Sequence, residues 1–288
     1  MTRLAVLADI HGNLPALEAV IKDIEQYTVD QVIVAGDLVN LGPFSQPVLE
    51  RITALGWVVI RGNHEYYLLD YGTARCPEPW RDDPALPHLA QQVSDYWRDQ
   101  VATLPDTLSL RFCDAPPVRV LHTFTYPQWD VVFPTTPDEA LLPKLAGIVE
   151  DIVVYGHSHF QDDRRVGRWH ILNPGSVGFP FDGIKLASYM ILDGSAQGWQ
   201  VTFRRVPFDY TPIFEEYERQ SFVQRCGVSG YLTVEELKAA RHFARPFHRW
   251  HTDHYPGQSA TVAQAREFLN SGDVWAYTSS EYRVNNLE

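Results

Sequence analysis

The sequence has few cysteines, no excess of basic residues and no long hydrophobic run, and each of these features excludes a class of protein. Cys76, Cys113 and Cys226 lie far apart in the sequence, so we do not expect a disulfide framework. We expect a cytoplasmic location instead. The longest apolar runs have the length of strands and Met1 leads directly into one, so we predict no signal peptide, membrane span or membrane partner. The net charge of −12 argues against a long nucleic acid as partner, because binding one requires a basic surface.

Length and composition predict an ordinary globular protein. The 288 residues are 45% hydrophobic and 21% charged, which is typical of a folded chain with a substantial core. We expect residues 1–207 to form the core and residues 208–288 a helical C-terminal extension packed on it. Two prolines punctuate the end of the β pattern, and residues 213–223 and 234–243 have a helical pattern. The sequence leaves the oligomeric state open.

Polar side chains follow the ends of five apolar, β-branched segments. The segments span residues 4–11, 31–37, 57–65, 118–124 and 152–159, and each has the pattern of a buried strand. Because open α/β sheets place their ligand sites at the carboxyl ends of strands, we expect these side chains to meet in one site. They are Asp9, His11, Asp37, Asn63, His64, Glu65, His122, His157 and His159.

The chemistry of this set is that of a metal centre. Carboxylate, carboxamide and imidazole donors without a thiolate suit manganese, iron, zinc, cobalt or nickel. A catalytic zinc site typically uses three protein ligands, whereas seven candidates are present here. If one carboxylate bridges, two ions can be held about 3.5–4 Å apart, as in binuclear phosphoester hydrolases. The alternative, separate and independently satisfied core residues, is the weaker interpretation because all five motifs lie at strand ends. The candidates are Asp9, His11, Asp37, Asn63, His122, His157 and His159.

The motifs resemble those of the calcineurin-like binuclear metallophosphoesterases, in particular the small bacterial phosphoesterase branch. The family pattern D-x-H, G-D, G-N-H-E, H and G-H-x-H occurs in this order, and Asn-Pro-Gly-Ser at residues 173–176 is similar to a segment of that branch. The matches span residues 4–193, two thirds of the chain. The resemblance implies an α/β fold with a two-sheet β-sandwich flanked by helices, the four-layer αββα metallophosphoesterase fold, here with a helical C-terminal extension.

The same resemblance implies a role for each site residue. Two divalent metal ions are expected, manganese first, with iron, zinc, nickel, cobalt or magnesium as alternatives. Metal-activated hydroxide would attack the phosphorus of a small phosphodiester or phosphomonoester, and His64 would be the catalytic histidine beside the metals. The ligands of one ion would be Asp9, His11, Asp37 and His159. Those of the other would be Asp37, Asn63, His122 and His157, so Asp37 would bridge the two ions.

Two segments depart from the family pattern. His122 is followed by Thr-Phe-Thr, where the bacterial branch usually has a Gly-Ser-Pro turn. Asp37 is followed by residues 38–43 without the D-R-G of protein Ser/Thr phosphatases. This absence removes an Asp that pairs with the catalytic histidine and an Arg that contacts phosphate, which argues against a phosphoprotein phosphatase. Glu65 or a backbone carbonyl remains as the partner that orients His64.

Two other functions stay open. A nucleotide-specific hydrolase, such as a dinucleoside polyphosphate pyrophosphohydrolase, would need a surface for a base. Tyr66, Tyr67, Tyr71 and Trp80 follow the G-N-H-E motif and could stack on a base, although they fit a small core equally well. A non-catalytic scaffold is disfavoured because no ligand of the pattern is missing.

Three histidines in the C-terminal extension, His248, His251 and His254, are spaced by three residues. They could bind metal, belong to a cap over the active site, or lie in a helix on the outside of the sandwich. Metal binding is the least favoured of the three, because histidine is common on ordinary surfaces.

The remaining pattern predicts the order of the elements. A right-handed parallel βαβαβ unit is expected from residue 4 to residue 63, with helices that begin after Asn13 and end at Gly56. One helix is expected over residues 89–101. An antiparallel hairpin with a turn at Asp193-Gly194 is assigned to the second sheet of the sandwich.

Overall fold

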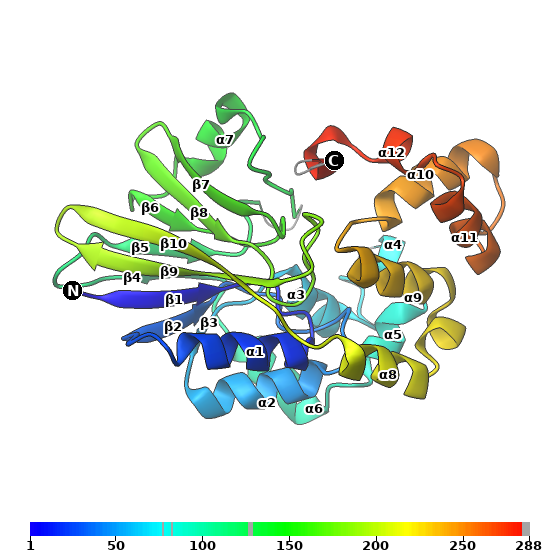
Figure 1. Ribbon diagram of the computed structural model, residues 1–288, viewed down its shortest axis with the longest axis horizontal. Coiled ribbons are helices and arrows are strands. Elements are labelled where there is room, and N and C mark those ends of the chain that lie inside the picture. The colour runs from blue at the N-terminus through cyan, green and yellow to red at the C-terminus, as the bar shows by residue number, and fades with distance from the viewer. Residues whose placement is uncertain (77, 82, 126–128, 284–288) are drawn as a thin grey trace.

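The computed structural model describes residues 1–76, 78–81, 83–125 and 129–283. Two five-stranded sheets have the orders β10-β9-β1-β2-β3 and β4-β5-β6-β8-β7 (Figure 1). The strands are β1 (Arg3–Leu7), β2 (Gln31–Val34), β3 (Val58–Val59), β4 (Thr107–Leu110), β5 (Val118–Leu121), β6 (Ile152–Val154), β7 (Gln161–Val166), β8 (Trp169–Pro174), β9 (Ala187–Ser195) and β10 (Gly198–Val206). The helices are α1 (Leu14–Ile24), α2 (Ser45–Leu55), α3 (Asn63–Asp70), α4 (Glu78–Arg81), α5 (Ala85–Ala90), α6 (Asp95–Thr103), α7 (Asp138–Leu145), α8 (Thr211–Arg219), α9 (Phe222–Ala239), α10 (Ala244–His254), α11 (Val262–Asn270) and α12 (Val274–Tyr277), followed by the 3-10 helix η1 (Ser280–Arg283).

The parallel unit at the start of the chain is confirmed. Strand β1 pairs parallel with β2, and β2 pairs parallel with β3. The Asn13 side chain accepts a hydrogen bond from the backbone N–H of Ala16 and so caps α1. Helix α2 ends at Gly56, which has a φ of 66° that glycine adopts without strain. Both helix boundaries therefore follow from local sequence signals.

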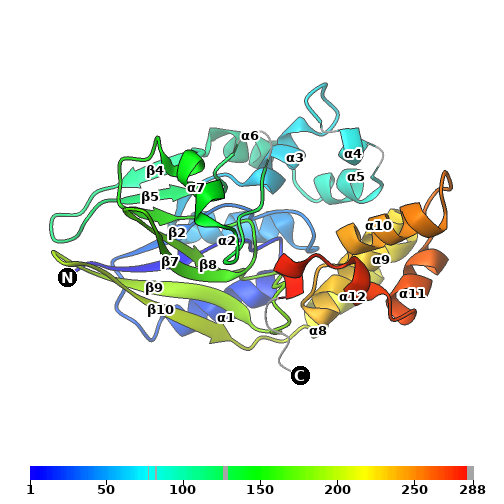
Figure 2. The same cartoon turned by 90° about the horizontal axis from the view of Figure 1, so that it is seen from above.

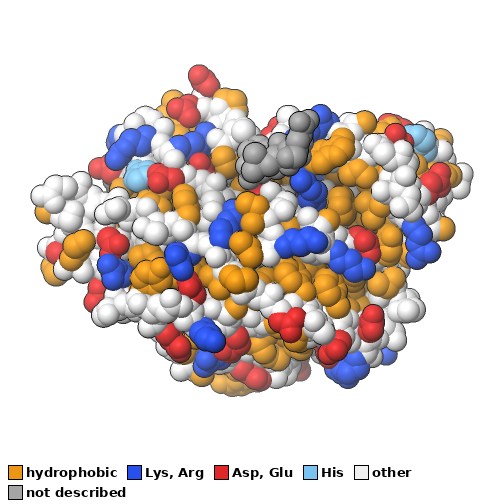
Figure 3. All heavy atoms as spheres, in the orientation of Figure 1, with side chains coloured by type: hydrophobic (Ala, Val, Ile, Leu, Met, Phe, Trp, Pro, Cys, Tyr) orange, Lys and Arg blue, Asp and Glu red, His pale blue; other side chains and the backbone are white. Residues whose placement is uncertain are grey.

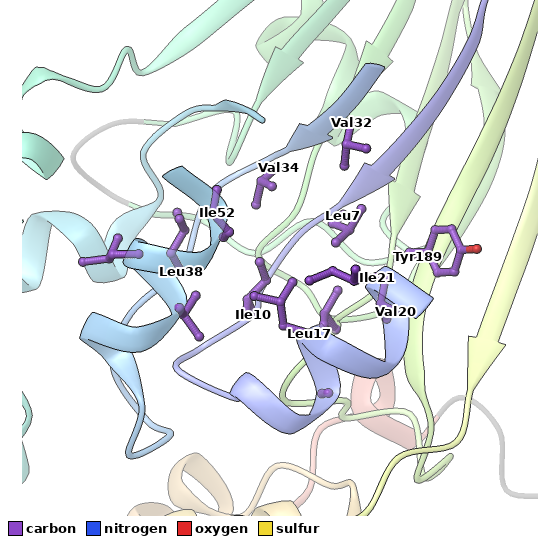
Figure 4. Close-up of a cluster of buried hydrophobic side chains, with 14 of the residues drawn as sticks. Leu7, Ile10, Leu17, Val20, Ile21, Val32, Val34, Leu38, Ile52 and Tyr189 are labelled. Carbon is purple, nitrogen blue, oxygen red and sulfur yellow. The ribbon is translucent and has the colours of Figure 1, made fainter. Parts of the chain in front are cut away.

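The alternation of side chains along β1 separates the layers. Ala5 and Leu7 belong to the core between the first sheet and helices α1 and α2 (Figure 4). Leu4 and Val6 point the other way, into the core between the two sheets. On the outer face of the second sheet, Val153 and its neighbours pack against α7. The four-layer sandwich expected from the sequence is confirmed.

The hairpin lies in a different sheet from the one expected. Strand β9 pairs antiparallel with β1, so β9 and β10 extend the first sheet and not the second. The turn also differs, because Asp193 stays in β9 and receives a hydrogen bond from Arg3 while the chain reverses between Ser195 and Gly198. Gly198 has a φ of 129°, a backbone conformation that favours glycine, so the turn lies at Gly198 and not at Gly194. Strand β9 pairs with the free edge of β1, and its residues from Ala187 to Leu192 are all buried there.

Two helix predictions were wrong in extent. Residues 89–101 form the end of α5 and most of α6, with a break between Ala90 and Asp95. The carboxylate of Asp95 lies in the first turn of α6, where it is favoured by the helix dipole. In the extension, α9 begins at Phe222, well before the predicted start at residue 234.

The C-terminal helices lie at one end of the sandwich, beside the helical insert that follows β3. Figures 1 and 2 both show α9 next to α5, and these two helices are in contact. Within the described residues, no helix has the length and apolar character required to cross a membrane. Cys76, Cys113 and Cys226 are free, as expected.

A buried ion pair between α1 and the first sheet gives a stability prediction. The Asp23 carboxylate accepts hydrogen bonds from Tyr189 Oη at 2.6 Å and from Arg204 Nη2 at 2.9 Å. Burial acts to raise the pKa of Asp23, but these hydrogen bonds more than offset it and the pKa is lowered. Asp23→Ala should cost about 1–3 kcal/mol, because it leaves the buried Tyr189 hydroxyl without its partner.

Urea unfolding of Asp23→Ala checks this value, with Glu18→Ala on the same helix as control. Glu18 pairs with Arg51 at the surface, and its removal should cost less than about 1 kcal/mol. The pKa of Asp23 is lower in the folded state than in the unfolded state. Its contribution to the free energy of unfolding is therefore complete above the unfolded-state pKa and is lost as the pH falls through the folded-state pKa. Equal losses in the two variants at neutral pH would contradict the prediction.

Candidate metal centre

The structure brings the seven predicted ligands together at the carboxyl ends of the strands. A first group contains Asp9, His11 and His159, with one potential ligand atom of each within 4.8 Å of the others. His159 Nε2 lies 3.1 Å from His11 Nε2 and 3.3 Å from Asp9 Oδ1. Asp37 borders this group, with its Oδ2 at 3.7 Å from His11 Nε2.

A second group contains Asp37, His122 and His157. Asp37 Oδ2 lies 3.2 Å from His122 Nε2, and Asn63 Oδ1 lies 3.0 Å from the same nitrogen. The backbone N–H of His157 donates to Asp9 Oδ2 at 3.1 Å, which ties the two groups together. The structure thus places every predicted ligand in one of two adjoining sets.

The spacing of these donors fits divalent cations. Protein ligands lie about 2.0–2.2 Å from a zinc-like ion, so neighbouring ligand atoms are roughly 3–3.5 Å apart. Three of the distances above, between His11 and His159, His159 and Asp9, and Asp37 and His122, fall in this range. Nε2 of His11 and Nε2 of His159 face one another, and their lone pairs can bind the same ion. The residues therefore fit the metal centre that the sequence predicts.

Backbone carbonyls fix which nitrogen of each histidine faces the centre. Nδ1 of His122 lies 2.7 Å from the carbonyl of Ala35, and Nδ1 of His159 bonds to the carbonyl of Phe179. Both rings therefore present Nε2 as ligand. His157 is reversed, because its Nε2 lies 2.9 Å from the carbonyl of Trp129 and leaves Nδ1 for the metal. Such bonds orient the rings of metal-binding histidines.

Burial favours the neutral imidazoles that bind metal. It lowers the pKa of His11 well below its usual range and the pKa of His157 to about 4. Burial acts in the same direction on His122, but the carboxylates of Asp37 and Asp9 raise its pKa to about 10. A cation beside Asp37 would take the place of this proton when the ring binds metal.

The backbone at the centre is strained. Asp9, His11, Asp37, His157 and His159 have φ values of 56°, 49°, 57°, 71° and 65°, in the left-handed region that such residues rarely adopt. Each such residue costs on the order of 1–3 kcal/mol, and strain of this kind clusters at functional sites. The surrounding packing holds the five side chains in the geometry required for the centre.

A glycine makes room for the bridging candidate. A Cβ on Gly62 would lie 2.2 Å from Asp37 Oδ1, so no other residue fits between the two motifs without a shift. The adjacent N–H of His64 donates to the same oxygen at 2.8 Å. The G-N-H-E motif therefore positions Asp37 through its backbone, in addition to the side chains that it supplies.

Glu65 is not the partner of His64, which removes one of the two orienting groups considered from the sequence. Its carboxylate accepts hydrogen bonds from the backbone N–H groups of Gly62, Asp37 and Leu38 at 2.7, 2.9 and 2.7 Å. Glu65 thus joins the loops after β2 and β3 beneath the centre. Burial together with the Asp37 charge raises the pKa of Glu65 to about 7, although these amides act against the shift.

His64 lies at the centre itself. Its ring packs edge-to-face against His11 at a centroid distance of 4.6 Å, and a nitrogen of His64 lies within 4.8 Å of the ligand atoms of His11 and Asp37. His64 Nδ1 is buried and has no hydrogen-bond partner among the described residues. Burial lowers the pKa of His64, although the charge of Asp37 acts against this shift. The rings of His11, Tyr67 and Trp80 pack edge-to-face around His64 and hold its orientation.

The Asn-Pro-Gly-Ser segment supports the loops that carry the ligands. Asn173 Nδ2 donates to the carbonyl of Gly156 at 2.8 Å, next to His157. Ser176 Oγ donates to the carbonyl of Asp9 at 2.8 Å. This segment therefore connects the D-x-H and G-H-x-H motifs from behind.

The aromatics that follow Glu65 divide into two groups. Tyr67 stacks on Trp80 at 4.3 Å and belongs with Tyr71 to a small apolar cluster, as the core alternative predicted. Tyr66 instead lines a hollow of about 430 Å³ beside His122. Sequence analysis missed Trp129, which lines the same hollow 5.2 Å from Tyr66. Its only sequence signal is an aromatic residue shortly after the His122 motif.

The histidines of the extension do not assemble a metal site in the part of the chain that the structure describes. His254 Nδ1 lies 2.9 Å from the carbonyl of Trp250, and His251 is buried against Phe247. His248 is exposed on the same helix, α10. None of the three belongs to a described group of potential metal ligands.

Comparison with known proteins finds similar sequences that cover most of the chain. The sequence pattern of the calcineurin-like phosphoesterase superfamily domain matches residues 2–197. The uncharacterized protein MJ0912 of Methanocaldococcus jannaschii is 25% identical over 261 residues, which cover 80% of this chain and 97% of that protein. Phosphodiesterase YfcE of Escherichia coli strain K12 is 29% identical over 203 residues, which cover 67% and 88%.

Two further similarities cover different parts of the chain. A symmetrical bis(5'-nucleosyl)-tetraphosphatase of Nitrosococcus oceani is 30% identical over 129 residues, 43% of this chain and 45% of that protein. The crystal structure of a metallophosphoesterase from Sphaerobacter thermophilus has the same fold, with a TM-score of 0.64, 22% identity and coverage of 83% of this chain and 99% of the other. Since the family pattern matches well over half of its residues, the chain belongs to the calcineurin-like phosphoesterase superfamily.

Proposed function

We propose that this protein is a metal-dependent hydrolase of small phosphoesters with a binuclear centre. One ion is held by Asp9, His11, Asp37 and His159, and the other by Asp37, Asn63, His122 and His157. Manganese is our first choice for both positions. Residues 1–207 form the catalytic core and residues 208–288 the extension that packs on it.

One observation carries the binuclear proposal. The same carboxylate oxygen, Asp37 Oδ2, lies 3.7 Å from His11 Nε2 and 3.2 Å from His122 Nε2. His11 belongs to one donor group and His122 to the other. A carboxylate in this position can bridge two ions, whereas independently satisfied core residues have no reason to converge on one oxygen.

The side chains of the centre divide the work. When bound, two divalent ions supply a hydroxide nucleophile near neutral pH and neutralise charge on the phosphoryl oxygens. Asn63 contributes a neutral oxygen, so Asp37 is the one carboxylate of its donor group. His64, whose Nδ1 has no hydrogen-bond partner among the described residues, is placed to donate a proton to the leaving oxygen.

A second candidate is a nucleotide-specific hydrolase of the same family. It is favoured by the hollow of about 430 Å³ beside His122, whose lining includes Tyr66, Phe124 and Trp129. A volume of this size accommodates a nucleobase with its ribose, and aromatic rings stack on bases irrespective of sequence. The relative named as a nucleosyl tetraphosphatase is consistent with this candidate over the part that it shares.

A substrate panel tests both proposals. With Mn²⁺, small aryl and nucleotide phosphoesters should be hydrolysed, and chelation should abolish turnover because the nucleophile depends on the ions. Phosphopeptides and long nucleic acids should be poor substrates, given the missing D-R-G segment and the net charge of −12. Metal content should be measured on the protein as purified, by elemental analysis.

The outcomes separate the candidates. Higher kcat/KM for nucleotide esters than for every nitrophenyl ester would favour the nucleotide-specific hydrolase. Faster turnover of a phosphopeptide than of every small ester would refute the general proposal. Full activity after complete removal of metal would refute it as well.

A further inference from the structure

The C-terminal extension is anchored next to a proposed metal ligand. The ring of Phe181 stacks on His159 at a centroid distance of 4.4 Å and an interplanar angle of 2°. Phe181 also contacts His242, at a centroid distance of 5.0 Å, in the segment that connects α9 to α10. The N–H of Gly183 donates to the carbonyl of Ala240 at 2.8 Å in the same region. One aromatic ring therefore separates the extension from the metal centre.

A buried carboxylate fixes the start of α10. Glu236 is 4% exposed, and its Oε1 accepts hydrogen bonds from the N–H groups of Phe243 and Ala244 at 2.6 and 2.8 Å. These amides at the start of the helix would otherwise lack partners. The next residue is Arg245, so its backbone has a fixed position relative to the metal centre.

The side chain of Arg245 is a cation near the centre that is not used by the fold. It is exposed, and within the described ranges it forms no hydrogen bond or ion pair. Burial and the Asp37 charge raise the pKa of Tyr67 to about 12, while a hydrogen bond with Asn63 and the charge of Arg245 act in the opposite direction. Tyr67 packs on His64 at 5.2 Å, so the guanidinium lies within electrostatic reach of the catalytic histidine's neighbour.

A hollow is present beside this cation. It has a volume of about 220 Å³, and its lining includes Arg245, Arg249, Ser279 and Tyr282. Arg245 and Arg249 are four residues apart on α10 and therefore share a face. Glu281 also lines the hollow, and its charge interacts with that of Arg249. On the face of the molecule that Figure 3 draws, several Lys and Arg side chains lie across the middle.

A guanidinium without a partner beside a hollow is suited to phosphate. Its planar fork donates two parallel hydrogen bonds to phosphate oxygens, and such charged bonds are about twice as strong as neutral ones. The volume is sufficient for one phosphate group and part of the molecule that carries it. Since the metal centre itself would hold the phosphorus under attack, a group bound here belongs to another part of the substrate.

We propose that Arg245 is a specificity-determining residue that binds a second phosphate group, so that the preferred substrates are small phosphoesters with an additional phosphate outside the metal centre. This inference rests on the proposed function. The extension then has a direct task in recognition, because it supplies a phosphate-binding arginine where the D-R-G segment of other family branches is absent.

Two matched substrates test the proposal: thymidine 5'-(4-nitrophenyl phosphate) and the same ester with a 3'-phosphate. Wild-type protein loaded with Mn²⁺ should prefer the phosphorylated ester. Arg245→Ala should lower kcat/KM for that ester by roughly 10- to 100-fold, the usual effect of losing a charged hydrogen bond, and should have a much smaller effect on the other. Arg245→Lys should restore part of the difference. Arg266→Ala, which removes an exposed arginine of α11, should not change the preference.

A binding measurement makes the test independent of turnover. By calorimetry, Arg245→Ala should bind thymidine 3',5'-bisphosphate roughly 10- to 100-fold more weakly and thymidine 5'-phosphate almost as well as wild type. Equal losses for both ligands, or no loss for either, would overturn the proposal. Selective loss of bisphosphate binding in a protein that hydrolyses neither ester would support the arginine site and refute the proposed function.

Discussion

Asp37→Asn is expected to remove both metal ions and to lower kcat/KM for small phosphoesters by about 10³-fold or more. The bridging position gives this residue a part in both donor groups, through the contacts of its Oδ2 with His11 and His122. The amide of asparagine has no net charge to balance two dications. The ions would supply several kcal/mol of transition-state stabilisation, and each 1.36 kcal/mol corresponds to about a factor of ten in rate.

Elemental analysis at saturating metal, with titration of Mn²⁺ into apoprotein, measures the effect of Asp37→Asn. Wild type should hold two ions per chain. Asp193→Asn is a suitable control, because Asp193 pairs with Arg3 on β1 and is not among the donors of the metal centre. A single ion in saturated wild type would refute the binuclear centre. Loss of only one ion in Asp37→Asn would refute the bridging role.

His64→Gln should retain both metals and lose activity to an extent that depends on the leaving group. General acid catalysis is worth about 10²–10⁴ in rate, and it matters most when the departing oxygen is a poor leaving group such as a ribose hydroxyl. Nitrophenolate leaves without a proton and should show a smaller loss. The structure permits this role because His64 Nδ1 is bound to no described group, and neither Glu65 carboxylate oxygen bonds to the ring.

Two roles of His64 can be distinguished, proton donation to the leaving group and hydrogen bonding to a phosphoryl oxygen. The measurement is kcat/KM of a ribose ester and of a nitrophenyl ester, each in wild type and in His64→Gln. If His64 instead donates a hydrogen bond to a non-bridging phosphoryl oxygen, both substrates should lose a similar factor. That result, with metal content unchanged, would exclude proton donation to the leaving group. His170→Gln, at a distant histidine that pairs with Asp163, should have no effect on either substrate.

The identity of the candidate ligands could be predicted from the sequence because each one lies within a short motif at the end of a strand. An apolar, β-branched segment followed by Asp9 and His11 predicts a buried strand that ends in polar side chains, and the structure has β1 with both residues directly after it. Similarly, the Asn13 cap and the Gly56 stop are local signals, and they define α1 and α2 as expected.

Strand partners could not be predicted in the same way. The hairpin of β9 and β10 has an alternating pattern that suits either sheet, and its place beside β1 depends on which edge is vacant when the sandwich closes. The break between α5 and α6 is comparable, since a continuous apolar stripe does not show where the chain must turn to pack on its neighbours.

The sequence by itself determined the family, the layers of the fold and the donor types of the metal centre, because these depend on residue chemistry and on short-range periodicity. Only the tertiary structure decided how each donor is presented. The carbonyls of Ala35, Phe179 and Trp129 select the nitrogen that each histidine offers, and every residue has a carbonyl, so no motif marks them. The electrostatic interaction of Arg245 with Tyr67 likewise joins segments far apart in the chain, which packing brings together and local sequence cannot specify.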